Sequence, residues 1–214
     1  MEAEKEKEFN KKFLLVEGNN DKHVVWALRE KLKISENFDV IDCRGRGELG
    51  KFIETTLKAP GVEALGIVID ADKDLRGSWN SVKDILKKDQ GVVAPDELPK
   101  TGWIGNFSNG FIKVGVWIMP DNNLNGMLED FISFMLPKDD KLMPVVEATL
   151  EDIEKKGLNK YAAVHKSKAK IHTWLSWQES PGTPLGASIT KKTLTTESET
   201  CVQFADWLKR LFEN

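Results

Sequence analysis

The chain has 214 residues, of which 40% are hydrophobic, and its 31 basic and 34 acidic side chains leave a formal charge of −3. This length suffices for one sizeable core or two small ones, and the apolar fraction is too high for a disordered chain. The near-balance of charge excludes a uniformly basic nucleic-acid coat protein, which would have a high isoelectric point. The net charge does not exclude local acidic or basic patches.

The first two-thirds of the chain alternate short apolar runs with helical patterns, which predicts βαβ units around a parallel sheet. The predicted strands are 13–16, 38–41, 64–69 and 112–119. The predicted helices are 21–32, 48–57, 78–88 and 126–136. Several glycines and prolines fall within residues 91–110, which predicts a long loop or a hairpin leading into the last strand.

After Pro137 the pattern is helical, with predicted helices at about 139–157, 161–177 and 200–212. A polar loop separates the last two. The sequence therefore predicts an α/β core over residues 1–136 and a helical C-terminal extension over residues 137–214, packed together as one unit.

Cysteine usage and apolar runs indicate the compartment. Cys43 and Cys201 lie far apart and form no zinc-binding spacing, so neither a disulfide framework nor a structural zinc site is expected. The first twelve residues alternate Glu and Lys without an apolar segment, so we expect no secretory signal. No apolar run is long enough to span a bilayer. We expect a cytoplasmic protein without a membrane partner.

Carboxylates follow three of the predicted strands, and in a parallel sheet these strand ends lie at one edge. The acids are Glu17 after the first strand, then Asp70, Asp72 and Asp74 after the third, then Asp121, Glu129 and Asp130 after the fourth. Crowded carboxylates repel one another unless a cation lies among them, and oxygen ligands favour Mg²⁺ or Mn²⁺. The pattern predicts a metal site, and the alternative is that each acid caps the helix that follows it.

Two further patterns in the chain resemble motifs of other functions. The run from Asp70 to Asp74 does not match a calcium loop, because Leu75 and Ser81 stand where Gly and Glu are required. Residues 45–50 match the G-x-G-x-x-G pattern of dinucleotide-binding proteins, but at the second βα turn rather than the first. Dinucleotide binding is therefore an alternative hypothesis. The chain contains neither a G-x-x-x-x-G-K-[ST] phosphate loop nor a G-x-S-x-G nucleophile elbow.

Taken together, these motifs resemble the Toprim family of topoisomerases, primases and nucleases. The resemblance rests on Phe13 to Asp21 (FLLVEGNND), on Gly66 to Asp74 (GIVIDADKD) and on the glycine turn at 45–47. The segment Pro120 to Asn123, with Gly126 and Glu129, resembles a small Toprim-related group near the OLD-type nucleases. The match covers about residues 13–136.

This resemblance implies a Toprim-like, Rossmann-like fold and Mg²⁺- or Mn²⁺-dependent phosphoryl transfer on nucleic acid by a small nuclease. It implies that Glu17 acts as general acid or base or helps to hold a metal. Asp70 and Asp72 would bind the metal with help from Asp74, while Asp121 and Glu129 would serve a second ion. The resemblance is also compatible with a non-catalytic, Toprim-like subunit that works with a partner ATPase, because the chain has no ATPase motif of its own.

A second group of residues predicts where nucleic acid binds. Arg44 and Arg46 lie beside the presumed metal site and are candidates for phosphate contacts. Residues 155–178 contain six lysines and no acid, and Lys166, Lys168 and Lys170 are further candidates. Trp174 and Trp177 follow and could stack bases, although a solvated helix face with both tryptophans in the core explains the same pattern.

Overall fold

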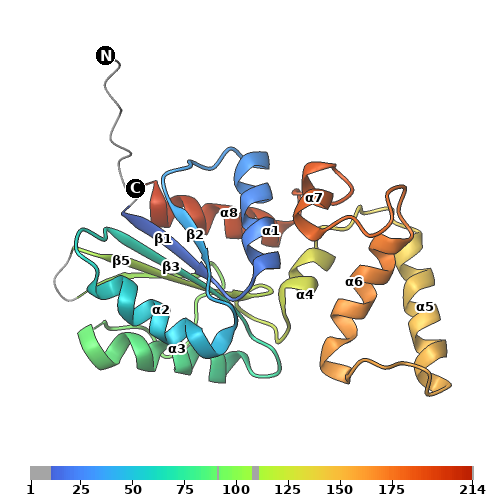
Figure 1. Ribbon diagram of the computed structural model, residues 1–214, viewed down its shortest axis with the longest axis horizontal. Coiled ribbons are helices and arrows are strands. Elements are labelled where there is room, and N and C mark those ends of the chain that lie inside the picture. The colour runs from blue at the N-terminus through green and yellow to red at the C-terminus, as the bar shows by residue number, and fades with distance from the viewer. Residues whose placement is uncertain (1–10, 91, 108–110, 214) are drawn as a thin grey trace, which may run out of the picture.

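The computed structural model describes residues 11–90, 92–107 and 111–213, so the segment 1–10 and the predicted loop residues Gly91 and Gly110 lie outside it. A five-stranded sheet has the order β2-β1-β3-β5-β4, with helices on both faces (Figure 1). The strands are β1 (Lys12–Val16), β2 (Asp39–Asp42), β3 (Ala64–Asp70), β4 (Trp103–Asn106) and β5 (Lys113–Met119). All pairings are parallel except that of β4 with β5. The predicted α/β class is confirmed.

The helices are α1 (Asn19–Lys31), α2 (Arg46–Lys58), α3 (Leu75–Gln90), α4 (Leu128–Ser133), α5 (Leu142–Lys155), α6 (Lys166–Ser176), α7 (Leu185–Thr190) and α8 (Glu199–Phe212), with a 3-10 turn η1 (Ala163–His165). A long loop and a hairpin were the two predictions for the segment before β5. The structure has the hairpin, because β4 pairs with β5. The structure differs from the predictions mainly at three places. Helix α4 begins after Gly126, whose φ is 146°, and ends at Ser133. The helix predicted at 161–177 begins only at Lys166, after η1, and α7 lies in a stretch predicted as loop.

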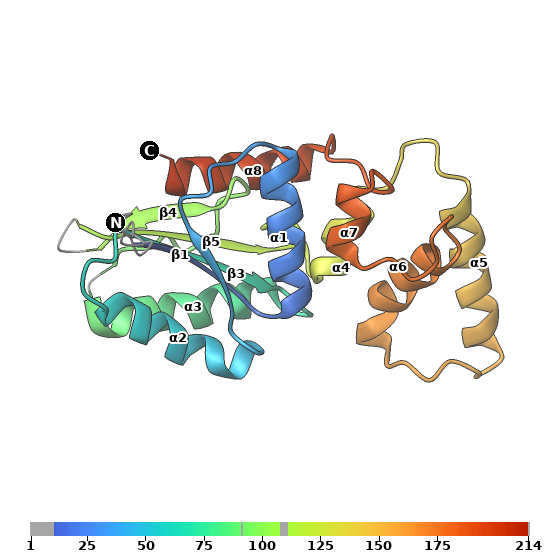
Figure 2. The same cartoon turned by 45° about the horizontal axis from the view of Figure 1, so that its top comes forward.

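Alternation along the strands divides the interior into two cores. Leu14 and Val16 of β1 belong to a cluster with residues of α1 and α8, whereas Leu15 belongs to a cluster with residues of α2 and α3. Figure 2 shows the same arrangement, with α1 and α8 on one side of the sheet and α2 and α3 on the other. Strands covered on both faces are apolar at every position, which explains why the runs in β1 and β3 are continuous.

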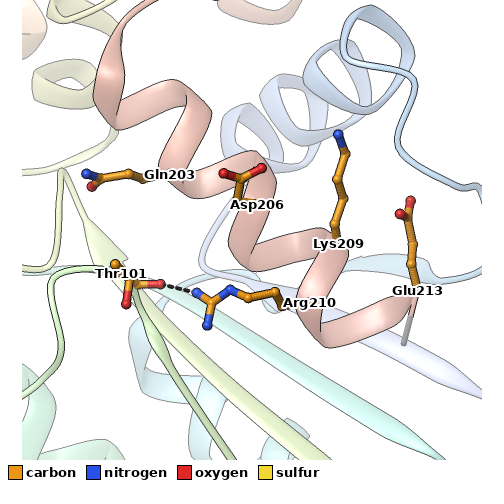
Figure 3. A pocket seen from close by; sticks show the side chains of 6 residues that line it. All are labelled: Thr101, Gln203, Asp206, Lys209, Arg210 and Glu213. Atoms are coloured by element: carbon orange, nitrogen blue, oxygen red, sulfur yellow. Dashed lines mark hydrogen bonds between the residues drawn. The ribbon is translucent and has the colours of Figure 1, made fainter.

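Helix α8 returns to the sheet although it is the last element of the chain. A Cβ atom at Gly66 of β3 or at Gly115 of β5 would lie within 3.0 Å of the Leu211 side chain, so the two glycines permit the close approach of α8. Arg210 of α8 also donates a hydrogen bond to the carbonyl oxygen of Thr101 before β4, beside a shallow pocket of mixed charge (Figure 3). The predicted C-terminal extension therefore supplies part of one cover of the sheet.

Helices α5 and α6 pack on each other and lie apart from the sheet, with α4 between them and the strands (Figures 1 and 2). Because α4 follows the carboxyl end of β5, this helical pair stands next to the edge where the predicted site residues lie. Within the described residues, no helix is both long and apolar enough to cross a membrane.

Candidate functional site

The carboxyl ends of β1 and β3 bring two predicted site residues together. Parallel pairing aligns Val16 with Val68, so Glu17 follows one strand beside the last residues of the other. Glu17 Oε1 accepts a hydrogen bond from the backbone N–H of Asp70 at 3.2 Å. Asp70 Oδ1 in turn accepts one from the backbone N–H of Leu128 at 2.9 Å. These two hydrogen bonds join β1, β3 and the start of α4 at one edge of the sheet.

Five carboxylates interact electrostatically at this edge, and we refer to them as the acidic cluster: Glu17, Asp21, Asp70, Asp72 and Glu129. Asp21 and Glu129 come from the first turns of α1 and α4, and they are only 8% and 3% exposed. Acidic residues are seldom buried to this degree without a partner. The cluster therefore combines strand ends with helix starts that are distant in sequence.

Burial and mutual repulsion oppose ionisation within the cluster. Burial, followed by the charges of Asp21, Glu17, Asp72 and Glu129, raises the pKa of Asp70 to about 9. Burial also raises the pKa of Asp21 to about 7, helped by the nearby charges of Glu17 and Glu129. The pKa of Glu17 is raised by burial as well, although the Asp70 N–H and Arg46 partly offset this effect. The described side chains thus leave the negative charge at Asp70 poorly compensated.

Glu129 has a different environment because α6 places two basic side chains beside it. Lys168 Nζ lies 3.6 Å and His172 Nε2 3.8 Å from Glu129 Oε1. Burial raises the pKa of Glu129, but the contacts with His172 and Lys168 outweigh burial, so the net shift is downward. The α5–α6 pair is therefore connected to the acidic cluster through a single buried carboxylate.

Arg46 lies on another side of the cluster, at the start of α2. Gly45 precedes it with a φ of 108°, a conformation that favours glycine. Arg46 Nη1 donates to the carbonyl oxygen of Asp70 at 3.2 Å and to Asp72 Oδ2 at 3.1 Å, and Nη2 donates to Ser78 Oγ at 2.6 Å. An open pocket of about 520 Å³ lies beside these residues. The glycine turn that matches the dinucleotide pattern thus positions an arginine against the end of β3.

Two of the predicted metal ligands, Asp74 and Asp121, accept hydrogen bonds in local turns. Asp74 Oδ1 accepts a hydrogen bond from the backbone N–H of Gly77 at 2.8 Å in the first turn of α3. Asp121 Oδ1 accepts two, from the backbone N–H groups of Asn123 at 3.0 Å and Leu124 at 2.8 Å. Neither acid is among the main causes of the pKa shifts in the acidic cluster. Asp74 has the helix-capping role that was the alternative for acids at strand ends, whereas Asp121 stabilises a turn before α4.

The lysines of α6 also separate into two groups. Lys166 Nζ lies 2.7 Å from Glu154 and Lys170 Nζ 3.3 Å from Glu147, so both are paired with carboxylates of α5. Lys168 alone of the three contacts the acidic cluster. Arg44 is exposed, and its backbone N–H donates to Asp42. Among the aromatic candidates, Trp174 is buried, whereas Trp177 is exposed.

The sequence analysis missed three residues of the site: Asp21, Ser78 and His172. For Asp21 a signal was available, because a carboxylate four positions after Glu17 falls in the first turn of the helix that starts there. The contacts of Ser78 and His172 depend on packing between distant elements and leave no local pattern. Within the described ranges, no three His, Cys, Asp or Glu side chains stand in a ready-made metal-ligand arrangement. The carboxylates of the acidic cluster could ligate a cation only after turning toward it.

The chain is similar to two solved structures. The C-terminal region of the Xanthomonas campestris pv. campestris OLD protein matches with a TM-score of 0.51 and 16% identity, covering 96% of this chain and 98% of that one. The corresponding region of the Burkholderia pseudomallei OLD protein matches with a TM-score of 0.50 and 13% identity, covering 94% and 98%. At this identity the likeness concerns the fold. A search of curated proteins gives no match. Residues 11–213 match the family described as protein of unknown function (DUF3226), and the chain belongs to that family.

Proposed function

We propose that this protein is a Mg²⁺- or Mn²⁺-dependent nuclease of Toprim type. The observation that carries the proposal is the acidic cluster, in which burial and mutual repulsion strongly raise the pKa values of Asp70 of β3 and Asp21 of α1, and neither carboxylate forms an ion pair with a basic side chain of the described residues. Such sites are more often functional than structural, because unpaired buried charge destabilises a fold. The resemblance of the strand-end motifs to Toprim proteins, and the OLD-like fold, support nucleic acid as the substrate.

The donor set of the cluster suits a hard divalent cation. Glu17, Asp21, Asp70 and Asp72 offer carboxylate oxygens, and neither Cys nor His is among them. A bound ion would polarise a phosphoryl oxygen and lower the pKa of a bound water. It would also relieve the repulsion that raises the pKa of Asp70.

The protein's own side chains would divide the remaining work. Glu17 has a raised pKa, which brings this carboxyl group closer to the range suited to a general base or acid near neutral pH. Arg46 is already held beside Asp70 and Asp72 and would orient a phosphate through its guanidinium group. Lys168 would contribute positive charge from α6, opposite the strand ends.

The test is a cleavage assay with purified protein, Mg²⁺ or Mn²⁺, and single-stranded, double-stranded and structured DNA and RNA. We expect metal-dependent cleavage that falls at least about a hundredfold in Glu17→Gln and in Asp72→Asn. Asp84→Asn, at an exposed position of α3, is the matched control and should retain activity. Absence of cleavage on every substrate with both metals would overturn the proposal.

A second candidate function is a non-catalytic, Toprim-like subunit that acts with a partner ATPase. The observation in its favour is that no ligand arrangement is ready-made among the described residues. Calorimetry distinguishes the two candidates, because a nuclease of this type must bind Mg²⁺ or Mn²⁺. Co-purification of an ATPase together with absence of metal binding would favour the subunit.

A further inference from the structure

Helices α1 and α7 form a groove of about 500 Å³ beside the acidic cluster. Its walls include Asn19, His23, Trp26 and Glu30 of α1, and Pro184 and Thr190 at the two ends of α7. The helices approach closely at its floor, where a Cβ atom at Gly186 would lie 2.5 Å from the carbonyl oxygen of His23. The volume is that of a small-molecule site.

Trp26 is the aromatic residue that this groove exposes. It is 39% exposed, whereas Trp79, Trp117, Trp174 and Trp207 are fully buried. Lys22 Nζ lies 4.8 Å from the centroid of the Trp26 ring, and the His23 ring meets it edge-on at 5.2 Å. These contacts hold the indole ring on the outer face of α1. An indole fixed in this way is a platform on which a flat aromatic ligand can stack.

The charge of the groove determines which part of a nucleotide it would bind. In the described part of the chain, neither lysine nor arginine is among the residues that line the groove, and Glu30 is its carboxylate; Lys22 lies over the Trp26 ring without being part of this lining. A phosphate would be repelled by Glu30. A neutral base is favoured, because Asn19, Asn20 and Glu30 offer hydrogen-bonding groups around an apolar wall.

The groove and the acidic cluster are next to each other at the first turn of α1. Asn19 and Asn20 line it and follow Glu17 almost directly, while Asp21 of the cluster lies on the same turn of α1. Trp26 is five positions after Asp21, which is about 7.5 Å along the helix axis and about 140° around it. A strand whose phosphate lies at the cluster would therefore pass around α1 to place a nearby base over Trp26.

We propose that this groove binds an unpaired base of a single-stranded segment, stacked on Trp26, and so selects substrates with unpaired nucleotides next to the scissile phosphate. The inference rests on the proposed function for its substrate class. A base within a duplex is stacked and paired on both sides, so it reaches the groove only after leaving the helix.

Tryptophan fluorescence tests the proposal without catalysis. The Trp177→Phe variant removes the other exposed tryptophan and leaves Trp26 as the exposed reporter. It is titrated in metal-free buffer with a single-stranded thymidine oligonucleotide, an oligouridine, an abasic oligomer of equal length and a duplex. We expect quenching by the first two, whose comparison identifies the preferred sugar, and little by the abasic oligomer or the duplex. In the otherwise wild-type protein, Trp26→Ala should weaken single-strand binding measured by anisotropy about tenfold and Trp26→Phe less, whereas Val202→Ala, at an exposed position of α8, should leave it unchanged.

Equal quenching by the abasic and base-bearing oligomers would overturn the proposal, and so would unchanged single-strand affinity in Trp26→Ala. Thermal unfolding of each variant confirms that it is folded. The binding assay contains no metal, so its result is separate from that of the cleavage assay. Metal-dependent cleavage without base-dependent quenching would remove only the base site, and quenching without cleavage would remove only the nuclease.

Discussion

The Glu17 carboxylate accepts a hydrogen bond from the backbone N–H of Asp70, with 3.2 Å between Oε1 and the nitrogen. The parallel pairing of β1 with β3 creates this contact between residues of two distant motifs. It fixes one oxygen of Glu17 against the end of β3. Glutamine keeps an oxygen acceptor at this place, so Glu17→Gln should preserve the local structure while removing the ionisable group.

Asp70→Asn should stabilise the metal-free protein near pH 8. The folded-state pKa of about 9 lies above the unfolded value, about 3.9, so ionisation of Asp70 reduces stability as the pH rises between these values. Asparagine stays neutral and can still accept the Leu128 N–H. We expect a gain of at least about 1.4 kcal/mol at pH 8, equal to one pKa unit, and a smaller gain at pH 5. Thermal unfolding in EDTA across this pH range measures it, and a gain that does not grow with pH would contradict the pKa.

Mg²⁺ or Mn²⁺ should raise the melting temperature of the wild-type protein, because a ligand that binds only the folded state stabilises it. The increase should be larger at pH 8 than at pH 5.5, since protons compete for Asp70 and Asp21 at the lower pH. Asp70→Asn should lose most of the increase, and Asp84→Asn should keep it. Equal increases in all three proteins would indicate binding elsewhere.

The sequence predicts that Asp121 is a metal ligand, whereas in the structure its carboxylate accepts two backbone hydrogen bonds. Asp121→Ala removes two hydrogen bonds to the turn at Asn123 and Leu124, so it should cost about 1–2 kcal/mol of stability. The melting-temperature increase with Mg²⁺ should be unchanged, because Asp121 lies outside the acidic cluster. Loss of this increase in a folded Asp121→Ala protein would support Asp121 as a metal ligand.

Lys168→Ala should destabilise the protein more than Lys166→Ala does. Lys168 neutralises Glu129, whose side chain is only 4% exposed, whereas Lys166 pairs with Glu154 on the outer part of the α5–α6 pair. Loss of Lys168 removes a charge that lowers the pKa of this buried carboxylate, so the pKa of Glu129 should rise. Chemical denaturation of the two variants at pH 8 provides the comparison, and equal stabilities would contradict the role of Lys168.

Local pattern was sufficient to predict the four parallel strands of the sheet. The apolar runs of β1, β3 and β5 are buried on both faces and stop at polar residues. The positions of these strands and the fold class therefore follow from the hydrophobic pattern and from the polar residues that end each run. Helix α7 was not predicted, because a helix of six residues shows little hydrophobic periodicity in the sequence. Leu185 and Ile189 are buried there through packing on α1 and neighbouring elements, which is a tertiary effect.

The sequence by itself determined that carboxylates follow the parallel strands, and hence that Glu17, Asp70 and Asp72 lie at one edge of the sheet. Only the tertiary structure decided which other acids join them. Asp21 and Glu129 enter from helix starts, while Asp74 and Asp121 turn back to their own backbone. It also decided that Lys166 and Lys170 pair with α5 and that Lys168 contacts the cluster. The reason is that a residue's type and spacing set its capacity for charge and hydrogen bonding, whereas its partner is selected by packing between distant elements.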